Sequence, residues 1–103
     1  MDSWSTAREV EKVKPLKVAL DPDVTAALKA IGQEVMRARG KFAPFNSAHE
    51  GYAVLLEEVD ELWAEVRRNQ RSRDVQKMRT EAIQVAAMAI RFLTDVVDKG
   101  AAR

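Results

Sequence analysis

The segment 46-NSAHEGYAVLLEEVDELWAEV-66 gives the clearest indication of the fold, because it carries the marks of a helix from its start onward. Ser47 is a suitable N-cap, and Glu50 follows at the spacing of a capping box. Apolar residues then recur at intervals of three and four, which predicts an α-helix from about 48 to 69 with one packed face. They are Tyr52, Leu55, Leu56, Val59, Leu62, Trp63 and Val66. We therefore expect Trp63 to lie in the core.

Two further helices are predicted on either side of this one. Asp21 followed by Pro22 favours a helix start, and the apolar spacing that follows predicts a helix from about 22 to 38, ended by Gly40. After the polar break NQRSRD, a third helix is expected from about 74 to 98, just before Gly100. Its middle, Ala82 to Ile90, is apolar on nearly every side except at Gln84, which is typical of a buried helix.

These patterns predict an all-α protein with one helical domain over residues 21–103 and a loosely held N-terminal arm over residues 1–20. A layer of three helices would leave the outer face of the third helix uncovered. We therefore expect a helical bundle completed by oligomerisation, as a homodimer or a homotetramer.

The composition excludes several functional classes. The chain has no cysteine, which excludes disulfides, thiolate metal sites and cysteine nucleophiles. Its formal net charge of +1 offers no general attraction to nucleic acid or to an anionic membrane. The first residues lack the apolar core of a signal peptide, and no apolar run approaches transmembrane length. We expect a cytoplasmic protein with neither a membrane nor a nucleic acid as its partner.

Acidic residues occupy the face of the second helix opposite its apolar face. Between Glu50 and Val66 there is no basic residue, whereas the acids are Glu50, Glu57, Glu58, Asp60, Glu61 and Glu65. One interpretation is a solvated surface. However, like charges four residues apart destabilise a helix by about 0.2–0.5 kcal/mol per pair. Carboxylates three residues apart, such as Glu58 and Glu61, also suit a hard divalent cation such as Mg²⁺.

The third helix carries a matching pair, Glu81 and Gln84, again three residues apart. If the second and third helices pack antiparallel, Glu58, Glu61, Glu81 and Gln84 can surround one ion. The alternative for Gln84 is a hydrogen bond between helices in the core, since a buried amide needs a partner. The sequence leaves both interpretations open.

The string Glu57-Glu58-Val59-Asp60-Glu61 reads as EExxE, and Glu81 begins a second acidic element about twenty residues later. Over roughly residues 24 to 96 the chain resembles the MazG-like all-α nucleoside triphosphate pyrophosphohydrolases, a family related to dimeric dUTPases and dCTP pyrophosphatase. The segment NSAHEGYAVLLEEVDELWAEV is especially similar to small MazG-related proteins of bacteria and their phages.

The resemblance implies a Mg²⁺ site, with Mn²⁺ as the alternative ion, formed by Glu58, Glu61, Glu81 and Gln84. It also implies that a (deoxy)nucleoside triphosphate is hydrolysed at its α-phosphorus to a monophosphate and pyrophosphate. Glu57 would orient the attacking water or help to hold a second ion. The chain departs from the family at Gln84, where the family has Asp, and a Gln carbonyl supplies no negative charge.

The resemblance further implies a base pocket built from the connection before EExxE, at Phe42, Phe45, Asn46 and His49. The two phenylalanines can equally form a hydrophobic plug between helices, whereas a histidine at the start of a helix, such as His49, is more often a surface residue than a ligand. Lys77 and Arg91 are the basic residues expected to reach a phosphate. The remaining basic residues between Arg67 and Arg79 are expected to form a solvated patch that balances the acidic helix.

The sequence is therefore compatible with two functional classes, and the third alternative is a purely structural bundle. The first is a Mg²⁺-dependent nucleotide pyrophosphohydrolase. The second is a catalytically weakened MazG-like module that binds a nucleotide or a protein partner, and Gln84 is the residue that favours it.

Overall fold

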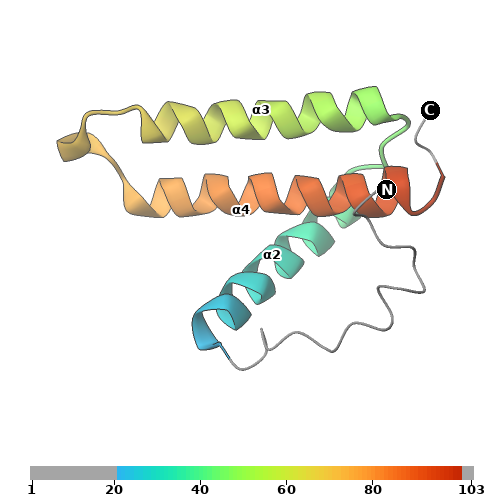
Figure 1. The fold of residues 1–103 in the computed structure, drawn as a ribbon, viewed down its shortest axis with the longest axis horizontal. Coiled ribbons are helices and arrows are strands. Elements are labelled where there is room, and N and C mark those ends of the chain that lie inside the picture. The colour runs from blue at the N-terminus through green and yellow to red at the C-terminus, as the bar shows by residue number, and fades with distance from the viewer. Residues whose placement is uncertain (1–20, 101–103) are drawn as a thin grey trace, which may run out of the picture.

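The computed structural model describes residues 21–100, which contain three α-helices and no strand. They are α2 (Pro22–Lys41), α3 (Ala48–Val66) and α4 (Val75–Arg91), shown in Figure 1. A short 3₁₀ turn, η2 (Gln70–Ser72), connects α3 to α4, and a π-helical turn, η3 (Phe92–Val97), extends α4. The all-α prediction is confirmed for this part of the chain. The predicted arm (1–20) and the end of the predicted domain (101–103) lie outside the described residues.

Each α-helix begins at a side chain that caps its free amides. Asp21 accepts hydrogen bonds from the amides of Asp23 and Val24 at 2.9 and 3.1 Å, as predicted. Ser47 accepts one from the amide of Glu50 at 3.1 Å, which confirms the predicted N-cap. Asp74 plays the same part for α4. These local bonds explain why the helix starts could be read from the sequence.

The helix ends differ more from the predictions. Gly40 does not end α2, which continues to Lys41, and the amide of Phe42 still donates to the carbonyl of Ala38 at 2.8 Å. Among the described glycines, only Gly100 has a positive φ, of 72°. The second helix ends at Val66, earlier than the predicted 69, and the third changes from α to π geometry after Arg91.

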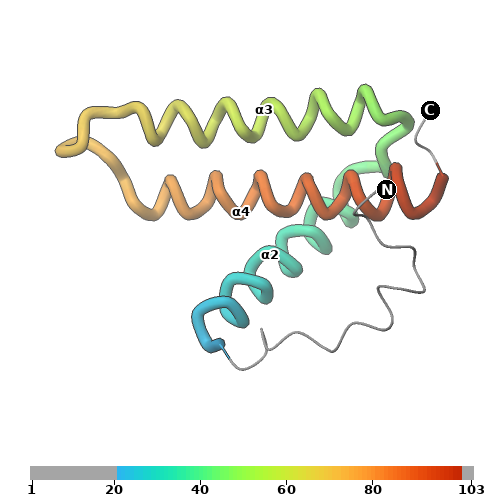
Figure 2. Tube along the Cα trace, in the orientation of Figure 1, coloured from blue at the N-terminus to red at the C-terminus, as the bar shows by residue number. Residues whose placement is uncertain are grey.

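Helices α3 and α4 run antiparallel and side by side, while α2 crosses them obliquely (Figures 1 and 2). Within the described residues α2 packs on α4 and does not pack on α3. Helix α4 is therefore the middle element, with α3 and α2 on different sides of it.

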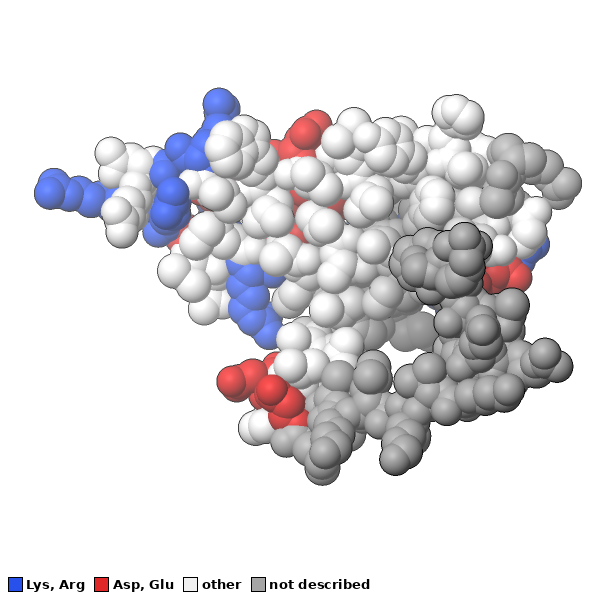
Figure 3. Space-filling model, in the orientation of Figure 1, with Lys and Arg blue, Asp and Glu red and all other residues white. Residues whose placement is uncertain are grey.

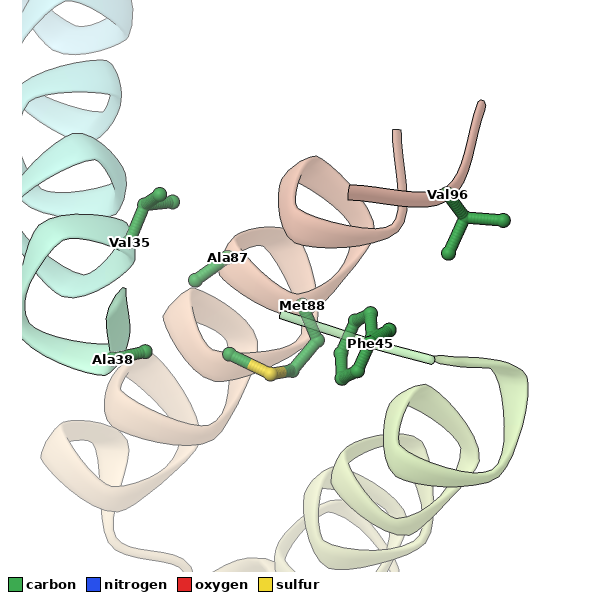
Figure 4. Close-up of a cluster of buried hydrophobic side chains, with 6 residues drawn as sticks. All are labelled: Val35, Ala38, Phe45, Ala87, Met88 and Val96. Atoms are coloured by element: carbon green, nitrogen blue, oxygen red, sulfur yellow. The ribbon is translucent and has the colours of Figure 1, made fainter. Parts of the chain in front are cut away.

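The core lies where these elements meet (Figure 4). Val35 and Ala38 of α2 face Ala87 of α4, while Met88 lies against Phe45 of the α2–α3 connection. At the start of α3 the backbone comes very close to the side chain of Phe92, where α4 passes into η3. A Cβ added at Gly51 would lie 2.7 Å from the ring of Phe92 and 3.1 Å from that of Phe45.

The prediction that Trp63 lies in the core is wrong, because its side chain is 58% exposed. Helix α4 covers only part of the apolar face of α3, and α2 does not reach the rest. The uncovered part forms a row along α3, which we call the α3 stripe: Tyr52, Leu56, Val59 and Trp63. No helix among residues 21–100 is both long enough and apolar enough to cross a membrane.

The two glycines Gly51 and Gly32 provide a matched test of this packing. We expect Gly51→Ala to lower the free energy of unfolding by about 1–3 kcal/mol, because the new methyl group would overpack the contact with Phe92. Gly32→Ala, which meets nothing within 4 Å in the middle of α2, should instead stabilise by up to about 1 kcal/mol. Urea unfolding followed by circular dichroism measures both. A Gly51→Ala protein as stable as Gly32→Ala would contradict the described approach of α3 to Phe92.

Candidate metal centre and adjoining cleft

Three carboxylates from two helices converge on one point. Glu58 and Glu61 lie one turn apart on α3, and Glu81 faces them from α4. One oxygen of each lies within 4.8 Å of an oxygen of the other two. The antiparallel packing of α3 on α4 is what brings Glu81, twenty positions further along the chain, to this place. We call these residues the acidic triad.

No basic side chain among the described residues forms an ion pair with the triad. The pKa of Glu58 is raised, first by burial and then by the nearby charges of Glu61 and Glu81. Burial also raises the pKa of Glu81, with a further contribution from Glu61. Within residues 21–100, negative charge is therefore concentrated here without a basic partner, whereas Glu65 nearby is paired with Arg68 at 3.2 Å.

Sequence reasoning missed Glu34 of α2, which lies beside the triad and is one of the charges that raise the pKa of Glu58. Its own pKa is lowered, first by the hydrogen bond from Arg37, and also by one from the side chain of Gln84. Arg37 binds both carboxylate oxygens, at 2.9 and 2.6 Å. A Glu and an Arg three residues apart are common on helix surfaces, so the sequence held no signal that Glu34 belongs to the site.

The interaction with Glu34 also favours one orientation of the Gln84 amide. An ionised carboxylate only accepts hydrogen bonds, so the Gln84 amide donates through its Nε2. The Oε1 atom is then the group that Gln84 keeps available as an acceptor. Gln84 on α4 thus interacts with Glu34 on α2, and this interaction is compatible with a role for the carbonyl oxygen as a ligand.

A cleft of about 470 Å³ lies next to the triad. Glu58 belongs to both, so the cleft reaches the acidic triad at this residue. All the helices and the α2–α3 connection contribute to its walls. The polar and aromatic lining residues are Glu34, Arg37, Phe42, Phe45, Asn46, Glu50, Glu57, Glu58, Gln84 and Arg91.

Of the four residues expected to bind a base, three line the cleft and one does not. Phe42 lines the cleft with 53% of its surface exposed, and Asn46 lines it beside Glu50. Phe45 also borders the cleft but is only 6% exposed, so it acts mainly as the hydrophobic plug. His49 lies elsewhere, in a shallow depression with Tyr52 and Phe92.

The two basic residues expected to reach a phosphate also differ. Lys77 is exposed and does not line the cleft. Arg91 does line it but is only 3% exposed, and its Nη2 donates to the carbonyl of Ala43 at 2.9 Å. Its guanidinium lies 4.3 Å from the centre of the Phe45 ring, and its Nε is 3.7 Å from Asp95. Arg91 therefore holds the α2–α3 connection against the end of α4.

The other basic residues from Arg67 to Arg79 lie at or near the α3–α4 connection, at the left of Figure 3. Arg68 pairs with Glu65, and Arg73 donates to the carbonyl of Val66 at 2.9 Å. All of the arginines and the lysine from Arg67 to Arg79 are exposed. This agrees with a solvated patch.

Burial of Glu58, together with the charges of Glu61 and Glu81 beside it, predicts a pH dependence of stability. Because the pKa of Glu58 is raised in the folded protein above its ordinary value of 4.5, the native state holds this proton more tightly than the unfolded chain does. In the absence of metal, the contribution of Glu58 is thus most favourable below pH 4.5 and is lost as the pH rises through the raised pKa.

We expect Glu58→Gln to remove this part of the pH dependence and to stabilise the metal-free protein at pH 7 by roughly 0.2–0.5 kcal/mol for each repulsion removed. Urea unfolding in EDTA across about pH 4 to 8 measures this expectation. Asp60→Asn, the same loss of charge at an exposed position of α3, is the control. Equal behaviour of the two variants would show that the triad carries no special repulsion.

Comparison of the chain with protein-family models, with curated protein sequences and with solved structures finds no match in any of the three. The function must therefore be argued from the triad, the cleft and the residues around them.

Proposed function

We propose that this protein is a Mg²⁺-dependent nucleotide pyrophosphohydrolase of the MazG-like type, for which Mn²⁺ is the alternative ion. It would hydrolyse a (deoxy)nucleoside triphosphate to a monophosphate and pyrophosphate. The observation that carries the proposal is the convergence, at the edge of a cleft, of three carboxylates that have no basic partner in the described part of the chain.

The donor set fits a hard divalent cation. Mg²⁺ prefers oxygen ligands and keeps several waters, so a few carboxylates on one side are sufficient. Glu58, Glu61 and Glu81 offer these oxygens within 4.8 Å of one another, and the Oε1 atom of Gln84 is left as an acceptor. When bound, the ion would offset negative charge on the phosphate oxygens and on the leaving group.

Glu57 is the residue best placed to act on water. It precedes Glu58 directly in the same turn of α3 and lines the cleft, yet it is exposed. In the proposed reaction, the water oxygen forms a bond to the α-phosphorus while the bond from that phosphorus to the bridging oxygen breaks. The water proton passes to the Glu57 carboxylate, and the bridging oxygen leaves with pyrophosphate.

The cleft itself has a suitable size and lining for a nucleotide. Its volume of about 470 Å³ falls within the range of about 300–1,000 Å³ that is common for small-molecule sites. The exposed ring of Phe42 offers a surface on which a base can stack. Asn46 supplies a polar group at the same wall.

The second candidate is a catalytically weakened module of the same type, which binds a nucleotide or a protein partner. Gln84 favours it, because a fourth carboxylate at this place would hold the cation more strongly than a carbonyl does. Glu34, which contacts Gln84, is itself paired with Arg37, so its charge is partly offset.

We further propose that a second copy of the chain covers the α3 stripe, in a homodimer or a homotetramer. Tyr52, Leu56, Val59 and Trp63 are each at least 40% exposed and lie on one side of a single helix. A continuous exposed apolar row of this kind is typical of an association surface.

The hydrolase proposal predicts release of pyrophosphate from a panel of nucleoside triphosphates in the presence of Mg²⁺. Glu58→Ala, Glu61→Ala and Glu81→Ala should each lower kcat/KM by at least about a hundredfold, because each removes a cation ligand. EDTA should abolish the activity, and Asp60→Asn should retain it. A pyrophosphate assay under steady-state conditions makes the measurement.

The position of Gln84 separates the two candidates within the same assay. If the wild-type protein is inactive on every nucleotide and Gln84→Asp becomes active, the weakened module is the correct description. Wild-type turnover that Glu58→Ala does not change would contradict the proposed site.

The proposed oligomer predicts that Trp63→Lys lowers the molar mass measured by light scattering to that of a monomer, because a charge would be buried in the interface. Met36→Lys, at a 64% exposed position on α2 outside the stripe, should leave the mass unchanged. A wild-type monomer at micromolar concentration would refute the oligomer and leave the hydrolase proposal to its own test.

A further inference from the structure

Asn46 and Glu50 form a hydrogen-bonded polar pair at the wall of the cleft. The backbone amide of Asn46 donates to Oε1 of Glu50 at 2.7 Å, and its side-chain Nδ2 donates to Oε2 at 3.3 Å. Glu50 is held in turn, since its own amide donates to the Ser47 hydroxyl at 3.1 Å. The pair is thus built into the start of α3, and both members line the cleft.

This arrangement determines which way the Asn46 amide points. The Glu50 carboxylate accepts hydrogen bonds and donates none, so the amide nitrogen must face it. The amide oxygen, Oδ1, is left without a hydrogen-bond partner among residues 21–100. Asn46 therefore offers the cleft an acceptor, and the spare lone pairs of Glu50 offer acceptors beside it.

The basic residues of the cleft are engaged with other groups. Arg91 directs Nη2 to the carbonyl of Ala43 at 2.9 Å and Nη1 to the sulfur of Met88 at 3.6 Å. Arg37 uses Nε and Nη2 to bind Glu34. The Asn46–Glu50 pair therefore presents hydrogen-bond acceptors to the cleft. Both nitrogen atoms of Asn46 already donate to Glu50, so the pair presents no donor there.

We propose that the cleft selects nucleotides whose base carries an exocyclic amino group, cytosine or adenine, over the matching oxo bases uracil, thymine and hypoxanthine. The amino group of such a base, stacked on Phe42, donates to Oδ1 of Asn46. An oxo group at the same position sets an oxygen lone pair against Oδ1 and against the Glu50 carboxylate. This inference rests on the proposed function and names its substrate class.

Two pairs of nucleotides test the proposal, because the members of each differ in shape very little. CTP and UTP differ at position 4 of the pyrimidine, and ATP and ITP differ at position 6 of the purine. We expect kcat/KM for pyrophosphate release to favour the amino member of at least one pair by about tenfold. Binding calorimetry with Mg²⁺ should give the same order. Equal values in both pairs, or a preference for the oxo members, would overturn the proposal.

Glu50→Gln is the variant that isolates the orientation of Asn46. A glutamine at this position can donate as well as accept, so the Asn46 amide is free to turn and present Nδ2 to the cleft. The preference for the amino base should then fall to about twofold or less, because the selectivity that one hydrogen bond supplies is lost. Asp60→Asn, with the same loss of charge on α3 outside the cleft, should keep the wild-type ratio.

Asn46→Ala, which removes the amide altogether, should also abolish the preference. Circular dichroism confirms that all three variants are folded. A ratio that survives both Glu50→Gln and Asn46→Ala would overturn the role of this pair.

The outcomes also separate this inference from the proposed function. Hydrolysis of all four nucleotides at equal rates sustains the hydrolase and refutes the selection. Tighter binding of the amino members of the pairs, without any turnover, refutes hydrolysis and sustains the selection. Absence of both turnover and binding refutes the two together.

Discussion

The antiparallel packing of α3 on α4 is the constraint on which the candidate site depends. At one end the register is set by the close contact between Gly51 and the ring of Phe92, where even a methyl group would not fit without movement. At the other end a short connection containing η2 joins the two helices. Between them, Glu81 comes to lie opposite Glu58 and Glu61. Burial and mutual repulsion raise the pKa of Glu58 and of Glu81, so this packing holds together charges that oppose it.

A buried polar network keeps the cleft wall in place next to the triad. Arg91 and Asp95 form an ion pair at 3.7 Å in which both side chains are almost fully enclosed. Arg91 also binds the carbonyl of Ala43, and Asp95 accepts a hydrogen bond from the amide of Phe45 at 3.4 Å. The α2–α3 connection is thus attached to the end of α4 through its backbone. Phe45 is fixed by these contacts, which leaves Phe42 as the exposed ring at the cleft.

Gln84 and Asn46 share one structural principle. Each is a neutral amide whose nitrogen donates to a glutamate, Glu34 in one case and Glu50 in the other. Because a carboxylate only accepts, each amide keeps its carbonyl oxygen for another partner. In the proposed function, one of these oxygens lies beside the cation site and the other beside the base. The glutamates then determine which group of each amide is left to recognise a ligand.

The features that the sequence determined by itself are local. Asp21 and Ser47 cap helices through bonds to amides two or three residues away, and the one-sided distribution of acids on α3 follows from helical spacing. The expectation that Glu81 meets Glu58 required one long-range assumption, that short-linked helices pack antiparallel, and the structure has this arrangement.

Tertiary structure alone decided which part of each apolar face is covered. Periodicity placed Trp63 among the apolar residues of α3, yet α2 packs on α4 instead and leaves Trp63 exposed. The same choice brought Glu34 beside Gln84, and the anchoring of the α2–α3 connection enclosed Arg91 and Phe45. Hydrophobic spacing reports that a face needs a partner, but it carries no information on which helix will supply one, because that depends on contacts between residues far apart in the chain.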